Sequence, residues 1–298
     1  MAFSPRNEFS WKLRSCALTL GPRTLVMGVL NVTPDSFSDG GRYASPDAAA
    51  AHASRLLDEG ADILDIGGES TRPGRHAQVT PDEEQGRILP VIEATLRAHP
   101  NAILSVDTWH ASTARAAVDA GAEIVNDVSG FLWDPEMPNA CRNLHCGIVL
   151  MHSRSRPGEW RSLPPLEPAE ILPIVGSGLE ISMGKAFDAG ITADHIVLDP
   201  GYGFGKAFGE NFTLLAHQHQ LRSLGRPILA GVSRKSFLGR GLADLHNGAD
   251  APISARGNAT LAATTAAILN GAHIVRVHDV RPTLEAARIA DAILAASA

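Results

Sequence analysis

Long apolar runs and cysteine pairs are both scarce in this sequence. Its 298 residues include three cysteines, Cys16, Cys141 and Cys146, with no Cys-x-x-Cys pair. A chain of this length does not need disulfides to hold its core, so we expect reduced thiols. No run of about 18 apolar residues occurs, which predicts no contact with a membrane. Residues 1–10 lack the apolar core of a secretion signal, so we expect a cytoplasmic protein.

Clustered positive charge is also missing. The formal net charge is −6, and the Lys and Arg residues are scattered along the chain. A nucleic-acid-binding protein needs a basic patch or stripe, so we expect no nucleic-acid partner. Isolated cations can still bind a small anionic substrate. No linker or low-complexity tract divides the chain, which predicts one domain.

Short apolar runs alternate with helical segments along most of the sequence. Four helices end at glycines, Gly60, Gly121, Gly190 and Gly271, and an apolar run follows each of them. The predicted strands are residues 25–30, 61–66, 102–106, 123–125, 147–151, 195–198, 228–232 and 273–277. The predicted helices start at residues 46 and 80 and then cover 108–120, 134–144, 168–189, 210–224, 258–270 and 282–295. Strict alternation of strand and helix predicts a parallel sheet.

Eight such units predict an α/β fold, a single (β/α)8 TIM barrel over residues 24–298. A chain of about 250 residues is enough for this fold. Residues 11–20 alternate apolar and polar side chains, which predicts an N-terminal β-hairpin, within residues 1–23, packed on the barrel. An open, doubly wound sheet is the competing architecture.

Each predicted strand ends on polar or functional residues. They are Asn31, Asp65, Asp107, Asn126 with Asp127, Met151 with His152, Asp199, residues 233–236, and Arg276 with His278. In a barrel of this kind the functional site lies at the carboxyl ends of the strands, so we expect these residues to converge.

The types of these residues indicate the ligand. Carboxylates and amides match the N–H edge of a flat nitrogen heterocycle, and the cations Arg72, Lys235, Arg276 and His278 suit phosphate oxygens. Asn31 suits Mg²⁺, which prefers one or two protein oxygens together with phosphate oxygens. The sequence therefore predicts a site for a bicyclic heterocycle that carries a phosphate or diphosphate.

Seven motifs resemble the dihydropteroate synthase family, in order from about Thr24 to the end of the chain. They are NVTPDSFSDGG (31–41), GGESTRPG (67–74), SVDT (105–108), NDVS (126–129), LDPGYGFGK (198–206), SRKS (233–236) and RVHDV (276–280). The resemblance implies a transferase of folate synthesis. Such an enzyme joins (7,8-dihydropterin-6-yl)methyl diphosphate to 4-aminobenzoate, which sulfonamides mimic. It also implies Mg²⁺ as cofactor and a homodimer.

The resemblance further implies a role for individual residues. Asn31 would hold the Mg²⁺ ion. Asp107, Asn126, Asp199 and Lys235 would hold the pterin, above a floor formed by Met151. The residues expected around the diphosphate are Thr71, Arg72, Arg276, Val277 and His278, and those around the aminobenzoate are Phe37, Thr71, Pro73, Phe204 and Ser236. Asp35, Lys235, Arg276 and His278 would be catalytic, with Asp35 stabilising a pterin cation or accepting the amine proton.

One segment departs from the family pattern, and three other functions stay open. Residues 153–160 read SRSRPGEW, where the family often shows an Arg-Gly-x-Pro element. The alternatives are a pterin-dependent methyltransferase, a lyase that forms an imine through Lys235, and an inactive pterin-binding paralogue. Glu69 is expected to be an acceptor within its loop. The residues expected at surface helix positions, with no ligand role, are His110, His217 and His219.

Overall fold

A computed structural model describes residues 3–33, 46–69 and 79–297 of the protein. The strands are β1 (Phe9–Lys12), β2 (Ala17–Leu20), β3 (Leu25–Asn31), β4 (Ile63–Gly67), β5 (Leu104–Asp107), β6 (Ile124–Asp127), β7 (Gly147–Met151), β8 (Ile196–Asp199), β9 (Leu229–Ala230) and β10 (Ile274–Val277). The α-helices are α1 (Pro46–Asp58), α2 (Pro81–Ala98), α3 (Ala111–Asp119), α4 (Met137–Leu144), α5 (Pro168–Asp188), α6 (Phe208–His217), α7 (Ser236–Gly241), α8 (Gly257–Leu269) and α9 (Val280–Ala295).

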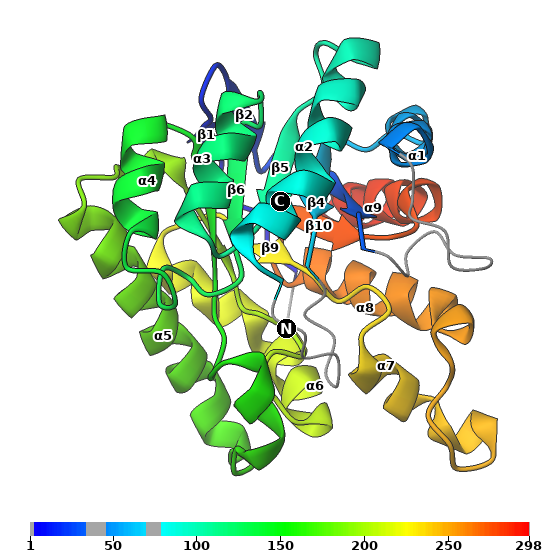
Figure 1. Ribbon diagram of the computed structural model, residues 1–298. Coiled ribbons are helices and arrows are strands. Elements are labelled where there is room, and N and C mark those ends of the chain that lie inside the picture. The colour runs from blue at the N-terminus through cyan, green and yellow to red at the C-terminus, as the bar shows by residue number, and fades with distance from the viewer. Residues whose placement is uncertain (1–2, 34–45, 70–78, 298) are drawn as a thin grey trace.

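The strands β3 to β10 form a parallel barrel, as predicted. Their order in the sheet is β8-β7-β6-β5-β4-β3-β10-β9, and a parallel bridge between Leu198 and Ile228 joins the two ends of that order. The helices lie around the strands (Figure 1). A ring joined in this way confirms the barrel and excludes the open, doubly wound sheet.

Several helices differ from those predicted: α4 begins at Met137 rather than at residue 134, α9 begins at Val280 rather than at residue 282, and α7 was not predicted. The helix expected from residue 108 begins at Ala111, because Thr108 and His110 instead bind the side chain of Glu84 in α2. The helix expected over residues 210–224 is α6 followed by a 3₁₀ helix, Gln218–Leu224. Within the described residues, no helix is both long and apolar enough to cross a bilayer.

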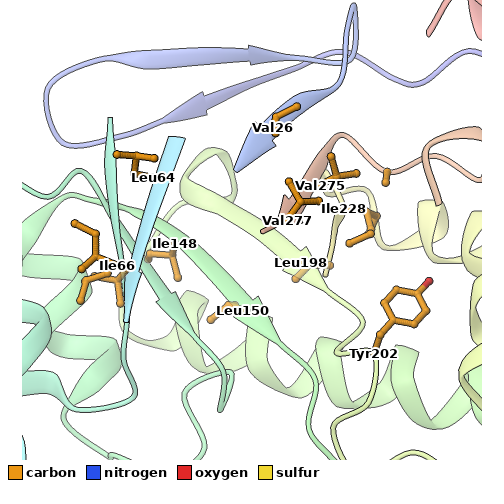
Figure 2. Packing of buried hydrophobic residues seen from close by; sticks show 14 of the residues in the cluster. Val26, Leu64, Ile66, Ile148, Leu150, Leu198, Tyr202, Ile228, Val275 and Val277 are labelled. Carbon is orange, nitrogen blue, oxygen red and sulfur yellow. The ribbon is translucent and has the colours of Figure 1, made fainter. Parts of the chain in front are cut away.

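Residues on the outer face of the barrel pack against the helices. Side chains alternate between the two faces of a strand, and the outward ones form one continuous buried cluster with apolar residues of the helices. Figure 2 shows part of this cluster, with Val26, Leu64, Ile66, Ile148, Leu150, Leu198, Ile228, Val275 and Val277 on or beside the strands. The outward residues of the strands are thus apolar, except for Asp127 at the end of β6.

The inner face of the barrel is divided into an apolar and a polar half. Near the amino ends of the strands, Met27, Ile63, Ile124 and other inward residues form a second buried cluster. The β1–β2 hairpin closes this end, because its residues Trp11, Leu13 and Leu20 belong to the same cluster. The polar residues predicted for the site therefore lie at the opposite, carboxyl end.

Trp11 anchors the hairpin to the barrel. Its side chain is fully buried, its ring approaches Gly147 at the start of β7, and its Nε1 donates a hydrogen bond to His195 O at 2.9 Å. Removing the ring would leave a cavity under the barrel.

Trp11→Ala should lower the free energy of unfolding by about 3–5 kcal/mol, the usual cost of deleting a buried aromatic ring. Trp11→Phe should lower it by less, since most of the ring remains. Thr19→Ala, on the exposed face of the same hairpin, is the matched control and should change it by less than about 0.5 kcal/mol. Urea denaturation measures all three. Equal stability of Trp11→Ala and Thr19→Ala would show that the hairpin is not packed as described.

Candidate active site

The strand register brings the predicted residues together at the carboxyl end of the barrel. Asn31 pairs with Gly67, Gly67 with Asp107, and Asp107 with Asn126 across neighbouring strands β3 to β6. Because these four residues are aligned, the side chains of Asn31, Asp107 and Asn126 share one face of the sheet, with Gly67 between them. Met151 and Asp199 form the next aligned pair, between β7 and β8.

Arg276, on β10, links the polar side chains at this end of the barrel, which together are called the polar ring below. Its Nε donates to Asp65 Oδ2 and its Nη2 donates to Asp107 Oδ2, both at 2.6 Å. Asn126 Nδ2 also donates to Asp65 Oδ2, at 3.0 Å. Burial alone would lower the pKa of Arg276, but Asp65 and Asp107 outweigh it and raise that pKa. Arg276 is therefore a permanent cation held between two carboxylates.

The environment of Asp107 brings the pKa of its carboxyl close to neutral pH. Burial raises the pKa of its carboxyl to about 7, with a further contribution from Asp65, while Arg276 opposes the shift. Such a group can exchange a proton with a ligand under physiological conditions.

Asp199 and Lys235 form the second part of the site. Asp199 Oδ1 accepts a hydrogen bond from Gly201 N at 2.7 Å, and burial raises the pKa of Asp199. Burial lowers the pKa of Lys235 to about 8, with a further contribution from Arg276, while Asp199 and Asp107 oppose this shift. Gly201 has φ +69°, and a Cβ there would lie 1.9 Å from His152 O. Only glycine fits this turn, which fixes the position of Asp199.

Asp199 and Arg276 lie on either side of Gly231, which follows β9. A Cβ at Gly231 would lie 3.7 Å from Asp199 Oδ2 and 3.9 Å from Arg276 Cβ. The two charged side chains are therefore neighbours, and Asp107, Asp199 and Arg276 share one location as predicted.

An apolar surface adjoins the polar ring. Met151, Val128 and Phe204 form a buried cluster, against which Trp109, Trp133 and Trp160 pack. Lys235 Nζ lies 4.0 Å from the centre of the Phe204 ring. Flat rings beside carboxylates and an ammonium group are suited to a planar ligand with a polar edge.

The loop after β7, in which residues 153–160 depart from the family pattern, contributes to this surface. Arg156 lies over both Trp109 and Trp133, with its Cζ 5.7 and 5.5 Å from their ring centres. Arg154 donates to Gly205 O at 3.1 Å, which joins the loop to the segment after β8. Arg154 and Arg156 therefore hold this loop against the site.

The last two strands contribute a hydroxyl, an imidazole and an ion pair. Ser233 Oγ lies 3.0 Å from His278 Nδ1, and Arg234 forms a two-pronged ion pair with Asp279 at 2.6 and 3.1 Å. Ser236 is exposed at the first position of α7. The side chain of Val277 instead lies in the outer hydrophobic cluster, so only its backbone faces the site.

Five predicted site residues lie outside the described part of the chain. They are Asp35, Phe37, Thr71, Arg72 and Pro73.

Two expectations need correction, and a third is confirmed with an addition. Asp127 is turned away from the ring, because its carboxylate accepts hydrogen bonds from Ser129 N and Phe131 N in its own loop. His110 is buried rather than on the surface, with its Nδ1 3.0 Å from Glu84 Oε2. Glu69 is an acceptor within its own loop, as expected, through the backbone of Val79, and it also accepts from Trp109 Nε1 in the next loop.

Two groups of residues were missing from the predicted binding set. Asp65 is fully buried and binds both Arg276 and Asn126. Its position at a strand end placed it among the residues expected to converge, but no binding role was predicted for it. The three tryptophans Trp109, Trp133 and Trp160 follow different strands, and no sequence spacing indicates that they meet.

Comparison with known proteins agrees with this site. Residues 27–278 match the family described as pterin binding enzymes. A dihydropteroate synthase of Bacillus subtilis is 43% identical over 278 residues, which cover 93% of this chain and 91% of that protein.

Two solved structures are also similar. The dihydropteroate synthase of Xanthomonas albilineans, solved with 4-aminobenzoic acid, has a TM-score of 0.84 and 41% identity, covering 96% of this chain and 99% of that one. The enzyme of Yersinia pestis, solved with a sulfonamide drug complex, has a TM-score of 0.86 and 38% identity, covering 97% and 100%. The fold and the polar ring thus define a pterin-binding enzyme with a (β/α)8 barrel. Within that class, the chain belongs to the dihydropteroate synthase family.

Arg276→Ala should lower the free energy of unfolding at pH 8 by about 3 kcal/mol or more, because it leaves the buried carboxylate of Asp65 without its cation. In the double variant Asp65→Asn/Arg276→Ala the loss should be clearly smaller than the sum of the single losses. Urea denaturation measures this cycle.

The matched control for this cycle is Arg281→Ala. Arg281 pairs with Glu285 on the exposed face of α9, and its removal should cost less than about 0.5 kcal/mol. Additive losses for Asp65 and Arg276 would contradict the described coupling.

Proposed function

We propose that the protein is a dihydropteroate synthase that joins (7,8-dihydropterin-6-yl)methyl diphosphate to 4-aminobenzoate and releases diphosphate. The observation that carries this proposal is the convergence of Asp107, Asn126, Asp199, Lys235 and Arg276 at the carboxyl ends of the strands. The family assignment agrees with it.

The polar ring is suited to hold the pterin by its edge. Asp107 and Asp199 would accept hydrogen bonds from ring and amino N–H groups, and the amide of Asn126 would both donate and accept. Lys235 would donate to a ring acceptor from its place over Phe204. Met151 and the neighbouring apolar residues would contact the ring face. This arrangement fixes the reacting CH₂ group relative to the rim.

Arg276 and His278 would hold the diphosphate. Both lie at the end of β10, and Ser233 positions the imidazole of His278. A cation about 4 Å from a leaving oxygen contributes roughly 4 kcal/mol at an effective dielectric constant of about 20. A few such groups can supply most of the stabilisation of the departing diphosphate.

Mg²⁺ fits at Asn31. A Cβ at Gly67 would stand 3.8 Å from Asn31 Oδ1 and 3.6 Å from Asp107 Oδ2, so these two oxygens flank the same glycine. Asp107 Oδ2 already accepts a hydrogen bond from Arg276, so Asn31 would be the protein ligand. Mg²⁺ prefers one or two protein oxygens, with phosphate oxygens completing its shell. When bound, it would neutralise charge on the diphosphate.

The reaction then needs little acid or base chemistry from the protein. The bond between the pterin CH₂ and the diphosphate oxygen breaks and leaves its electron pair on that oxygen. The amine nitrogen of 4-aminobenzoate forms the new bond and afterwards loses a proton. An aromatic amine is neutral at pH 7 and needs only positioning, so a strong general base is unnecessary. Phe204 and the exposed Ser236 would contact the aminobenzoate.

Three finer expectations accompany the proposal. A sulfonamide drug should compete with 4-aminobenzoate, since the related Yersinia pestis enzyme was solved with one. Assembly as a homodimer and a cytoplasmic location stay predictions from the sequence.

Lys235→Ala should lower kcat/KM for dihydropteroate formation by about 100-fold or more, because it removes a charged donor from the pterin site. Lys185→Ala, at an exposed position in the last turn of α5, is the matched control and should leave turnover unchanged. The measurement is product formation from the pterin diphosphate and 4-aminobenzoate. Near-normal turnover by Lys235→Ala would remove this lysine from the site.

A further inference from the structure

Three side chains with metal-binding atoms meet beside the pterin site, at a place that the proposed reaction does not use. Glu69 follows β4, Glu84 lies in the first turn of α2, and His110 immediately precedes α3. One potential ligand atom from each lies within 4.8 Å of the other two. Glu84 and His110 are buried, with exposed fractions of 1% and 8%.

Among the residues that the structure describes, no permanent cation balances the buried charge of Glu84. Among the described residues, its ion-pair partner is His110, at 3.0 Å, and no Lys or Arg pairs with it. The nearby Arg87 donates instead to Gly68 O. Glu84 Oε1 is fully buried and has no hydrogen-bond partner in the described part of the chain. An isolated buried carboxylate oxygen of this kind is costly, which indicates a missing positive partner.

Glu69 adds a second carboxylate to the same place. Burial raises its pKa, and the nearby charge of Glu84 raises it further, while the hydrogen bond from Trp109 opposes the shift. Two carboxylates this close repel each other unless a proton or a cation lies between them. A divalent ion would neutralise both and would give Glu84 Oε1 a partner.

The donor set is that of a transition-metal site. Two carboxylates and one imidazole are ligands of Zn²⁺ and its neighbours, and three protein ligands leave one position for water. Ligand atoms around a tetrahedral Zn²⁺ lie roughly 3.4 Å apart, so shifts of about 1 Å would close the cluster around an ion.

Neighbouring donors already orient both carboxylates. Thr108 Oγ1 donates to Glu84 Oε2 at 2.9 Å, and Trp109 Nε1 donates to Glu69 Oε2 at 3.1 Å. Outer hydrogen bonds of this kind are typical of protein metal sites.

We propose that Glu69, Glu84 and His110 bind one divalent transition-metal ion of the Zn²⁺ class. This site is distinct from the Mg²⁺ position at Asn31, because it needs no phosphate oxygens and uses an imidazole. The ion links the segments after β4 and β5 to the start of α2. It thereby braces the two strands that carry Asp65 and Asp107.

The test is a titration of the full-length, chelator-treated protein with Zn²⁺ by calorimetry and with Co²⁺ by visible absorption. No substrate, diphosphate or Mg²⁺ is present, so the result does not depend on the proposed function. We expect one ion per chain and a tetrahedral or five-coordinate Co²⁺ spectrum. Glu84→Gln and His110→Gln should each weaken binding by about 100-fold or more. Glu83→Gln, an exposed neighbour in the same turn of α2, is the matched control and should bind as the unmodified protein does.

Circular dichroism shows whether the two buried variants fold. If either does not, Glu69→Gln replaces it, since Glu69 is only partly buried, and the same loss of affinity is expected. Absence of binding up to millimolar Zn²⁺ would overturn the proposal. So would unchanged affinity in the folded variants, or a Co²⁺ spectrum with the strong thiolate band that Cys141 and Cys146 would give.

Discussion

The buried contact of Arg276 with Asp65 and Asp107 is the interaction on which the site depends. Asp65 is fully buried and cannot be solvated, so the guanidinium must stay beside it. The same guanidinium holds Asp107, whose neighbour in register is Asn126. Residues from β4, β5, β6 and β10 are therefore fixed by one cation. A ligand that carries negative charge meets an arginine that is already positioned and has little freedom to lose.

This arrangement is possible because each strand changes character along its length. Outward residues other than Asp127 are apolar and hold the helices, whereas inward residues are mostly polar beyond the half that Trp11 and the hairpin close. Charges can be buried in the other half because they are paired with each other and with backbone donors, as Asp199 is with Gly201. The buried charges thus lie apart from the hydrophobic clusters that stabilise the fold, and their desolvation is offset by their own partners.

Much of this could be predicted from the sequence, for identifiable reasons. Strand and helix periodicity, with terminal glycines such as Gly60, gave the barrel, and strand-end position gave Asp107, Asp199 and Arg276. Asp127 shows the limit, because adjacent residues on a strand face opposite sides and a one-residue ambiguity reverses their roles. His110 and the tryptophans show another, since contacts between loops depend on tertiary packing that no local spacing encodes.

We propose that residues from Asn31 to His278 form one site for a pterin and a diphosphate. Calorimetric titration of a pterin analogue, with and without diphosphate and Mg²⁺, tests it most directly. If the two ligands bind side by side in one site, their binding is coupled. Diphosphate with Mg²⁺ should then raise the affinity for the pterin analogue by about tenfold, and the analogue should raise the affinity for diphosphate by the same factor. Unchanged pterin affinity, with no detectable diphosphate binding, would contradict the account and favour pterin-dependent methyl transfer.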